Sequence, residues 1–212
     1  VSFRLLLGLY GIIPACLLLQ LADTFFLNGR LLENLPSSPT HFLLFQILFG
    51  TPHILASSIL LTTNSEYLRF YKPKLILMTL LIIAFFGIGS LFIPYLAFYV
   101  ITASWTVYHV LKQQIGVGRG VYRLPDALFY WLLWLSVGAG IFFYLGIFLN
   151  NTVTAQQAEW IKFASASFCI GLLFTRVFCH RYIDNQMGRS FLWANTLLVI
   201  ASFYLYIQAN HL

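Results

Sequence analysis

Residues 126–149 read DALFYWLLWLSVGAGIFFYLGIFL, and this stretch decides the fold. It carries no charged side chain after Asp126 and no proline. A helical run of about 20 apolar residues matches the roughly 30 Å thickness of the hydrocarbon core of a bilayer. We therefore predict a helix that crosses a membrane here.

The rest of the chain has the same character. Of its 212 residues, 60% are hydrophobic, 18% are aromatic and 8% are charged, whereas soluble proteins carry about 25% charged residues. Three cysteines, an odd number, argue against a secreted disulfide scaffold. The composition also excludes a disordered tail and a nucleic-acid-binding domain. The net charge of +6 is attributed to basic residues that orient the chain in the membrane and contact anionic lipid headgroups. The predicted partner is the lipid bilayer.

Apolar runs recur along the sequence and predict an all-α integral membrane bundle, a single domain over residues 1–212 with about seven transmembrane helices. The runs lie at about 3–21, 41–61, 74–92, 94–114, 126–149, 158–179 and 190–208. The third and fourth are separated at Gly87, Gly89 and Pro94, because an unbroken helix over both would be about 60 Å long. Helices pair their own backbone groups in lipid, and the runs lack the alternation of a barrel.

Basic residues orient this bundle. With a cytoplasmic N-terminus, ten of the twelve Lys and Arg lie on inner segments, and only Arg30 and Lys162 lie outside. This bias follows the positive-inside rule and predicts a multi-pass protein of the cell membrane, with the bacterial inner membrane expected. Residues 22–40 predict an outer loop, and the glycine-rich residues 116–120 predict a flexible inner loop after the fourth span.

Polar side chains at bilayer depth are costly, so each is a candidate functional residue. His53 follows Pro52 in the middle of the second span, where the proline kinks the helix and frees a backbone carbonyl. His109 belongs to a polar stripe on the fourth span. This stripe is expected to point into the bundle, and it consists of Thr102, Thr106, His109 and Gln113.

The sixth span repeats the pattern toward its inner end. Its polar face contains Ser165, Cys169, Arg176 and His180. Two interpretations of His180 are open. It forms a solvated loop with Arg181 and Asp184, or it joins His53 and His109 in one site, with Asp184 orienting the imidazole ring.

Three histidines from three helices form a ligand set that suits a transition metal. We predict one metal held by His53, His109 and His180, with iron expected and copper, zinc or a haem held by two histidines left open. The six acidic residues lie at or near span ends, which disfavours a two-metal carboxylate site. The three cysteines lack metal-binding spacing and are predicted to be small buried hydrophobes. Three tryptophans are predicted to lie at the interface or against lipid, namely Trp131, Trp134 and Trp160.

The string Gly50, Thr51, Pro52, His53 and the later Ser104–His109 with Gly116 resemble motifs of the membrane β-carotene-cleaving dioxygenases, which are related to bacteriorhodopsin biogenesis. The resemblance covers residues 49–116. It implies a non-haem iron held by histidines in a helical bundle, acting with O₂ on a lipid-soluble polyene. Only His53 and His109 match the family's histidines. The chain departs from the family after each of them, with Ile54 and with Val110.

Three functions remain open from the sequence. The first is a membrane metal-dependent oxidoreductase, an oxygenase acting on an apolar substrate that arrives from the lipid. The second is a transport or binding bundle, in which His53, His109 and Arg176 line a polar path. The third is an accessory structural subunit without catalysis, whose polar stripes hold helices together by hydrogen bonds.

Overall fold

A computed structural model of the chain describes residues 3–34, 55, 59, 63–149 and 152–209. These residues form helices joined by short turns, and no strand occurs among them. The predicted all-α class is therefore confirmed over these ranges. Most of the predicted second span, about 41–61, lies outside them together with His53.

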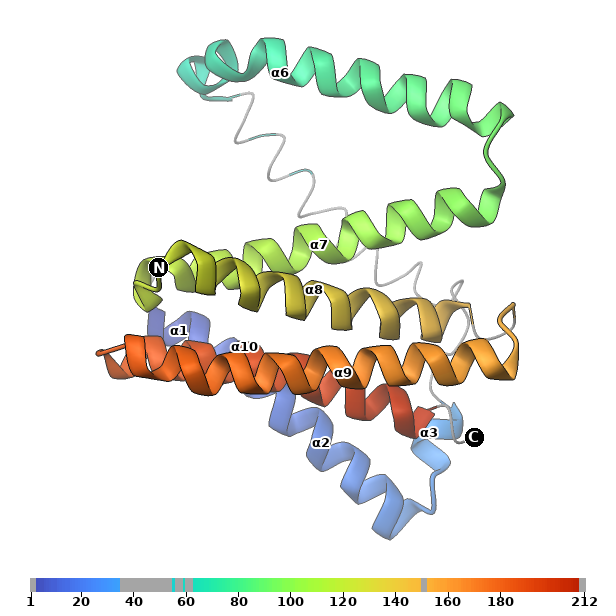
Figure 1. Cartoon of the computed structure of the whole chain (residues 1–212), viewed down its shortest axis with the longest axis vertical. Helices are drawn as coiled ribbons and strands as arrows, with labels where there is room; N and C mark the ends of the chain where they lie inside the picture. The colour runs from blue at the N-terminus through green and yellow to red at the C-terminus, as the bar shows by residue number, and fades with distance from the viewer. Residues whose placement is uncertain (1–2, 35–54, 56–58, 60–62, 150–151, 210–212) are drawn as a thin grey trace. The chain divides into compact units, whose positions relative to one another are not determined.

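The chain divides into two compact units, Val1–Glu33 with Val100–Leu212, and Asn34–Tyr99. The prediction of a single domain stays a prediction. The first unit opens with a series of short helical segments (Figure 1), namely α1 (Phe3–Gly8), η1 (Leu9–Gly11), α2 (Ile12–Ala22), η2 (Asp23–Leu27) and α3 (Arg30–Asn34). It continues with long helices, namely the main part of α7 (Tyr95–Tyr122), α8 (Asp126–Phe148), α9 (Ala155–Cys179) with η7 (His180–Tyr182), and α10 (Gln186–Ala209).

In the second unit, α6 (Ser65–Ile83) continues through η5 (Ala84–Ile88) and η6 (Gly89–Leu91). Asn64 caps the start of α6, because its side chain accepts a hydrogen bond from the Tyr67 backbone N–H at 3.0 Å. The chain turns after Leu91, and the rings of Phe85 and Phe98 lie 4.9 Å apart across the turn. The break predicted at Gly87, Gly89 and Pro94 is therefore confirmed. The helix begins earlier than predicted, so that Arg69, Lys72 and Lys74 lie on it.

Five helical segments of the described chain are long and apolar enough to cross a membrane, a property compatible with a multi-pass membrane protein. They are Leu9–Leu27, Ser65–Leu91, Asp126–Phe148, Ala155–Tyr182 and Gln186–Gln208. Each overlaps a predicted span. The fourth predicted span lies on α7, which is long enough but carries too many polar side chains to belong to this set. The count of seven and the orientation stay predictions.

Two predicted loops are helical instead. Residues 116–120 belong to α7, which continues to Tyr122 because Ile115 and Tyr122 are buried in the core and hold its last turns in place. Part of the predicted outer loop 22–40 is formed by η2 and α3. There the buried Asp23 carboxylate accepts a hydrogen bond from the Leu31 N–H at 2.7 Å across the turn at Asn28.

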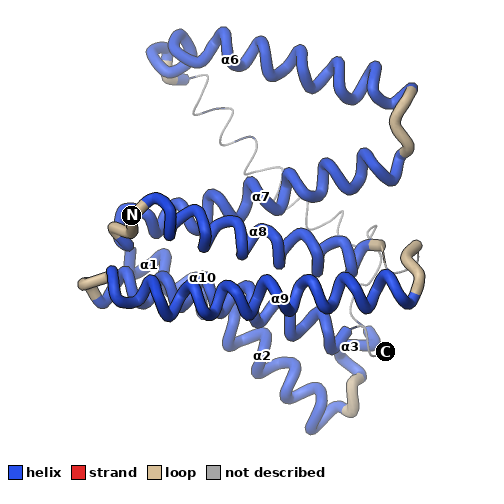
Figure 2. The backbone as a smooth tube through the Cα atoms, in the orientation of Figure 1, coloured by secondary structure: helices blue, strands red, loops and turns tan. Residues whose placement is uncertain are grey.

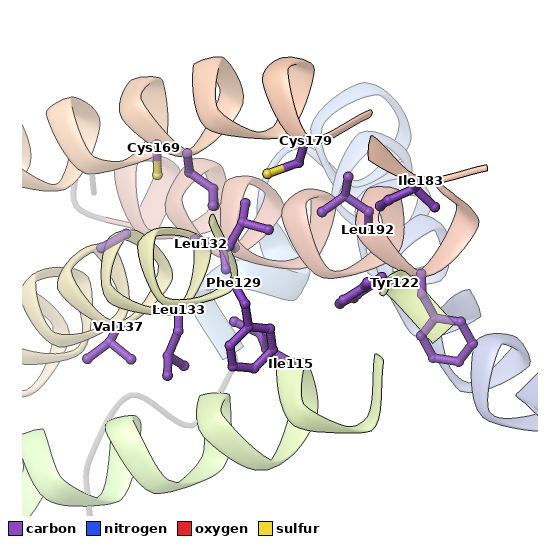
Figure 3. Packing of buried hydrophobic residues seen from close by; sticks show 14 residues of the cluster. Ile115, Tyr122, Phe129, Leu132, Leu133, Val137, Cys169, Cys179, Ile183 and Leu192 are labelled. Carbon is purple, nitrogen blue, oxygen red and sulfur yellow. The ribbon is translucent and has the colours of Figure 1, made fainter. Parts of the chain in front are cut away.

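The core of the first unit lies between α8, α9 and α10. Helices α8 and α9 make the most extensive contact, and α10 packs against both (Figures 1 and 2). Thr154 and Gln157 form a reciprocal capping box that fixes the start of α9. Side chains from α8 and α9 meet those of α7 and α10 in this cluster (Figure 3), including Phe129, Leu132, Leu133, Cys169, Cys179 and Leu192. The two α9 cysteines are thus buried, as predicted, while Cys16 is partly exposed.

Gly138 permits the close approach of α8 to α9. A Cβ atom at this position would lie 2.5 Å from Cε1 of Phe168 on α9, where nothing but hydrogen fits. The Phe168 ring also stacks on Phe142 at 5.7 Å, so it cannot move away without losing that contact.

Gly138→Ala should therefore destabilise the protein by about 1–3 kcal/mol, the range for inserting a methyl group into a packed core. Gly116→Ala on α7 is the matched control, because nothing lies within 4 Å of its Cβ position, and alanine there should stabilise the helix by about 0.5–1 kcal/mol. Thermal unfolding midpoints in detergent measure both. Equal effects of the two substitutions would contradict the close approach.

Candidate functional site

Six polar or charged side chains are buried in the described chain, which are Asp23, Ser136, Ser165, Arg176, Asn195 and Thr196. Two are satisfied within their own helix, because Ser136 and Thr196 donate hydrogen bonds to the carbonyl oxygens of Leu132 and Leu192 at 2.8 Å. Such local bonds hold a hydroxyl in an apolar helix at little cost. Asp23 accepts the hydrogen bond from the Leu31 N–H described above. The remaining buried side chains belong to two groups, one around Asn195 and one that contains Arg176 and Ser165.

Asn195 joins three segments by hydrogen bonds. Its Oδ1 accepts from the Tyr10 hydroxyl at 2.6 Å, and its Nδ2 donates to the Tyr122 hydroxyl oxygen at 2.5 Å and to the Phe191 carbonyl at 3.1 Å. Tyr10 lies in η1, Tyr122 at the end of α7, and Asn195 in α10. The amide therefore ties the start of the chain and the end of α7 to the same point of α10. We call Tyr10, Tyr122 and Asn195 the Asn195 network.

Gly118 leaves room for the Tyr122 ring, because it has no side chain. The ring lies back along α7 over Gly118, and a Cβ atom there would lie 2.5 Å from Cε2 of Tyr122. Burial raises the pKa of the Tyr122 phenol above its ordinary value. The phenol therefore stays protonated at neutral pH, and its oxygen serves as the acceptor for Asn195.

A pocket opens beside the Asn195 network. Its volume is about 170 Å³. The Tyr10 ring meets the buried Phe191 ring edge to face at 6.1 Å on one side of it. The exposed Leu9, Ile12 and Val117 surround its opening. Its lining is apolar except at Tyr10 and Gln114, and consists of Leu9, Tyr10, Ile12, Gln114, Val117, Phe191 and Leu198. We call this the Tyr10 pocket.

The second group lies on α9. Arg176 is 3% exposed, and its guanidinium is in contact with the face of the Trp193 ring on α10. Its Nε, the Ser165 hydroxyl and the His180 Nδ1 are buried and have no hydrogen-bond partner in the part of the chain that the structure describes. Ser165 and Cys169 are buried too, so this polar face of the sixth predicted span does point inward as predicted.

A second pocket lies at the end of α7, and its lining includes two charged side chains. It has a volume of about 380 Å³ and lies between the α7 end and the α9–α10 connection. Asn185 closes one side, because its Nδ2 donates to the Val121 carbonyl at 2.8 Å and its Oδ1 accepts from the Gly188 N–H at 2.5 Å. Arg123 and Asp184 both line it, so that opposite charges balance there. This balance favours neither a cation nor an anion as a ligand.

The predicted metal ligands are placed only in part. His53 lies outside the described residues, His109 is exposed in the middle of α7, and His180 is partly buried in η7. The other polar residues of the His109 stripe are exposed as well in the described chain, and because most of the second predicted span lies outside the described residues, the prediction that this face points inward stays a prediction. Asp184 is exposed and forms no hydrogen bond with His180 Nδ1. Within the described ranges, no group of three or more His, Cys, Asp or Glu side chains could hold a metal ion.

Sequence reasoning missed the Asn195 network. Asn195 is a polar residue in the predicted span 190–208, and this alone marks it as a candidate. Its partners could not be found by helical periodicity, because they lie 185 and 73 residues away. The predicted exposure of Trp131, Trp134 and Trp160 is confirmed, since each is more than half exposed.

Comparison with protein-family models, with curated proteins and with solved structures finds no match to this chain.

Asn195→Leu tests the Asn195 network. Leucine keeps the volume but leaves two tyrosine hydroxyls without a partner, so the free energy of unfolding should fall by about 1–3 kcal/mol. Combining Asn195→Leu with Tyr10→Phe and Tyr122→Phe should recover most of this loss, because a fully apolar set has no unpaired group. Chemical unfolding in detergent measures each variant. A triple variant that is less stable than Asn195→Leu would contradict the network.

Proposed function

We propose that this chain is a multi-pass membrane protein that takes one end of a lipid-soluble small molecule into the Tyr10 pocket. The observation that carries the proposal is the pocket itself, an apolar hollow with two polar groups beside a fixed hydrogen-bond network. Ligand pockets commonly combine an apolar lining with a few placed polar side chains. Its open side is bordered by exposed apolar residues, which face lipid when the flanking helix Leu9–Leu27 crosses a bilayer.

The volume limits what the pocket holds. About 170 Å³ is close to the roughly 150 Å³ cavity that accepts benzene, and well below the roughly 300 Å³ lower limit for drug-sized ligands. The pocket therefore holds a single ring or a short length of chain, and the remainder of the molecule lies outside it among lipid. Tyr10 and Gln114 supply the only polar side chains of the lining, and they suit one hydroxyl or carbonyl group.

A pocket for an apolar ligand of this kind is compatible with a binding or transport protein and also with an oxygenase. In the Asn195 network, the side chains orient one another, exclude water and hold Tyr10 in place at the pocket. This supports ligand binding and positioning.

The iron-dependent oxygenase is the second candidate, in keeping with the resemblance of residues 49–116 to the membrane dioxygenases. The observation that favours it is the His180 imidazole, which has a buried nitrogen without a partner in the described chain. A neutral imidazole nitrogen is a good ligand for iron, copper or zinc. The metal would be held by His53, His109 and His180, and would supply O₂ activation near an apolar substrate.

A photoreactive fatty acid with a diazirine on its terminal carbon tests the Tyr10 pocket. Irradiation in phosphatidylcholine vesicles should label peptides that contain Val117, Phe191 and Leu198. Val117→Trp fills the opening and should reduce this labelling several-fold. Val177→Trp, at a similarly exposed valine on α9, is the matched control and should leave it unchanged. Labelling spread evenly over all exposed apolar helix faces and insensitive to Val117→Trp would contradict the pocket.

Metal analysis with an optical spectrum of the purified protein tests the second candidate. An iron site formed by the three histidines should give near-stoichiometric iron that is lost in His53→Ala, His109→Ala and His180→Ala alike. Iron lost only in the first two variants would remove His180 from the site. A Soret band would indicate haem, and protein free of metal and chromophore would contradict the oxygenase while leaving the binding function intact.

A further inference from the structure

Arg176 carries a buried charge without an anionic side-chain partner among the described residues. All six acidic residues of the sequence lie within the described ranges, and none forms an ion pair with Arg176. Asp126 pairs with Arg119, and Glu159 pairs with Lys162. A guanidinium stays charged in proteins, and an unpaired buried charge is strongly destabilising. The contact with the Trp193 ring offsets only part of this penalty. A counter-ion from outside the chain would offset the rest of it.

The position of Arg176 along its helix sets its depth. The segment Ala155–Tyr182 has 28 residues and is about 42 Å long, which matches the roughly 40–45 Å of a bilayer with its headgroups. Arg176 lies six residues before Tyr182, or about 9 Å from the end of the segment. When this segment crosses a centred bilayer, the Arg176 backbone lies about 3 Å inside the edge of the roughly 30 Å hydrocarbon core, and the long arginine side chain can extend to the level of the lipid phosphates.

Further donors surround this point. Arg189 lies one turn before Trp193 on α10 and is exposed. Its Nε donates to the Ile183 carbonyl at 2.7 Å, which fixes the side chain at the corner between α9 and α10. His180, the first residue of η7, lies one turn after Arg176, and its Nδ1 is buried without a hydrogen-bond partner among the described residues. Two arginines and an imidazole thus gather at one end of the α9–α10 pair.

The surface beside these donors is apolar. Trp193 is 42% exposed, and Leu197, one turn further along α10, is 45% exposed. A strip of this kind, which starts at a cation and runs along a membrane-spanning helix, fits an acyl chain below a charged headgroup. An acidic side chain of a partner protein would match the cation but not the strip.

We propose that the α9–α10 corner binds one anionic phospholipid. The phosphate pairs with the Arg176 guanidinium, Arg189 and His180 donate further hydrogen bonds, and one acyl chain lies along Trp193 and Leu197. Guanidinium and phosphate suit each other because two parallel N–H donors match two phosphate oxygens. Inorganic phosphate shares this chemistry, so the test separates the two sources. The proposal rests on the membrane insertion proposed above but not on the Tyr10 pocket.

The test compares protein in vesicles of phosphatidylcholine alone with protein in vesicles that also contain phosphatidylglycerol. Flotation with phosphatidylcholine vesicles after an alkaline wash, which removes peripherally bound protein, first establishes insertion, and failure to float would overturn the membrane function. For inserted protein, phosphatidylglycerol should raise the thermal unfolding midpoint by several degrees, because a ligand that binds only the folded state stabilises it. Arg176→Gln should abolish this shift. Arg181→Gln, an exposed arginine at the same end, is the matched control and should retain it.

Arg189→Gln provides a second variant at an exposed residue, and it should reduce the shift; its loss of the bond to the Ile183 carbonyl affects the midpoint equally in both vesicle types. An equal midpoint in both vesicle types, for inserted wild-type protein, would overturn the proposal and leave a carboxylate of a partner protein as the counter-ion. An unchanged shift in both Arg176→Gln and Arg189→Gln would overturn it as well. If inorganic phosphate added to phosphatidylcholine vesicles stabilises the protein as much as phosphatidylglycerol does, the ligand is free phosphate, and the proposal of a bound phospholipid is overturned.

Discussion

The structure depends on how its buried polar side chains are hydrogen-bonded, because a polar group that is removed from water costs free energy unless the protein or a ligand supplies a partner. The structure separates these side chains into two groups. Ser136 and Thr196 bond to their own helices, and Asn195 bonds to two tyrosines. Along α9, in contrast, Ser165, Arg176 and His180 retain buried atoms without partners in the described chain. The first group accounts for packing, and the second is where we propose that a ligand binds.

Helix α10 connects these two groups. Asn195 and Trp193 are two residues apart, so they point to nearly opposite sides of the helix. Asn195 contacts Tyr10 and Tyr122, whereas Trp193 contacts Arg176. The Asn195 side of α10 borders the Tyr10 pocket, for which we propose a lipid-soluble ligand. The Trp193 side contacts the unpaired Arg176 guanidinium, for which we propose a lipid headgroup. Helix α10 packs against both α8 and α9, and these two helices make the most extensive contact with each other.

Apolar periodicity was sufficient to predict the helices but not their ends. The break before Pro94 and the buried face with Ser165, Cys169 and Arg176 follow from local rules of helix geometry. Residues 116–120 were wrongly predicted as a loop, because glycine propensity was outweighed by the burial of Ile115 and Tyr122, a tertiary effect. The orientation of the Thr102–Gln113 stripe stays a prediction, because most of the second predicted span lies outside the described residues. Polarity locates a side chain on a helix face but does not indicate which face the neighbouring helices cover. The pairing of Tyr10 with Asn195 depends on the folded arrangement alone.

The central claim is that α9 crosses a bilayer and places Arg176 at one edge of it. Single cysteines at Ala155 and Arg181, in a chain whose three native cysteines are replaced by alanine, test it most directly with a membrane-impermeant maleimide applied to sealed vesicles. If α9 crosses the bilayer, the two positions should react from opposite sides, with residue 181 on the side that carries most of the basic residues. Reaction of both positions from the same side would contradict it.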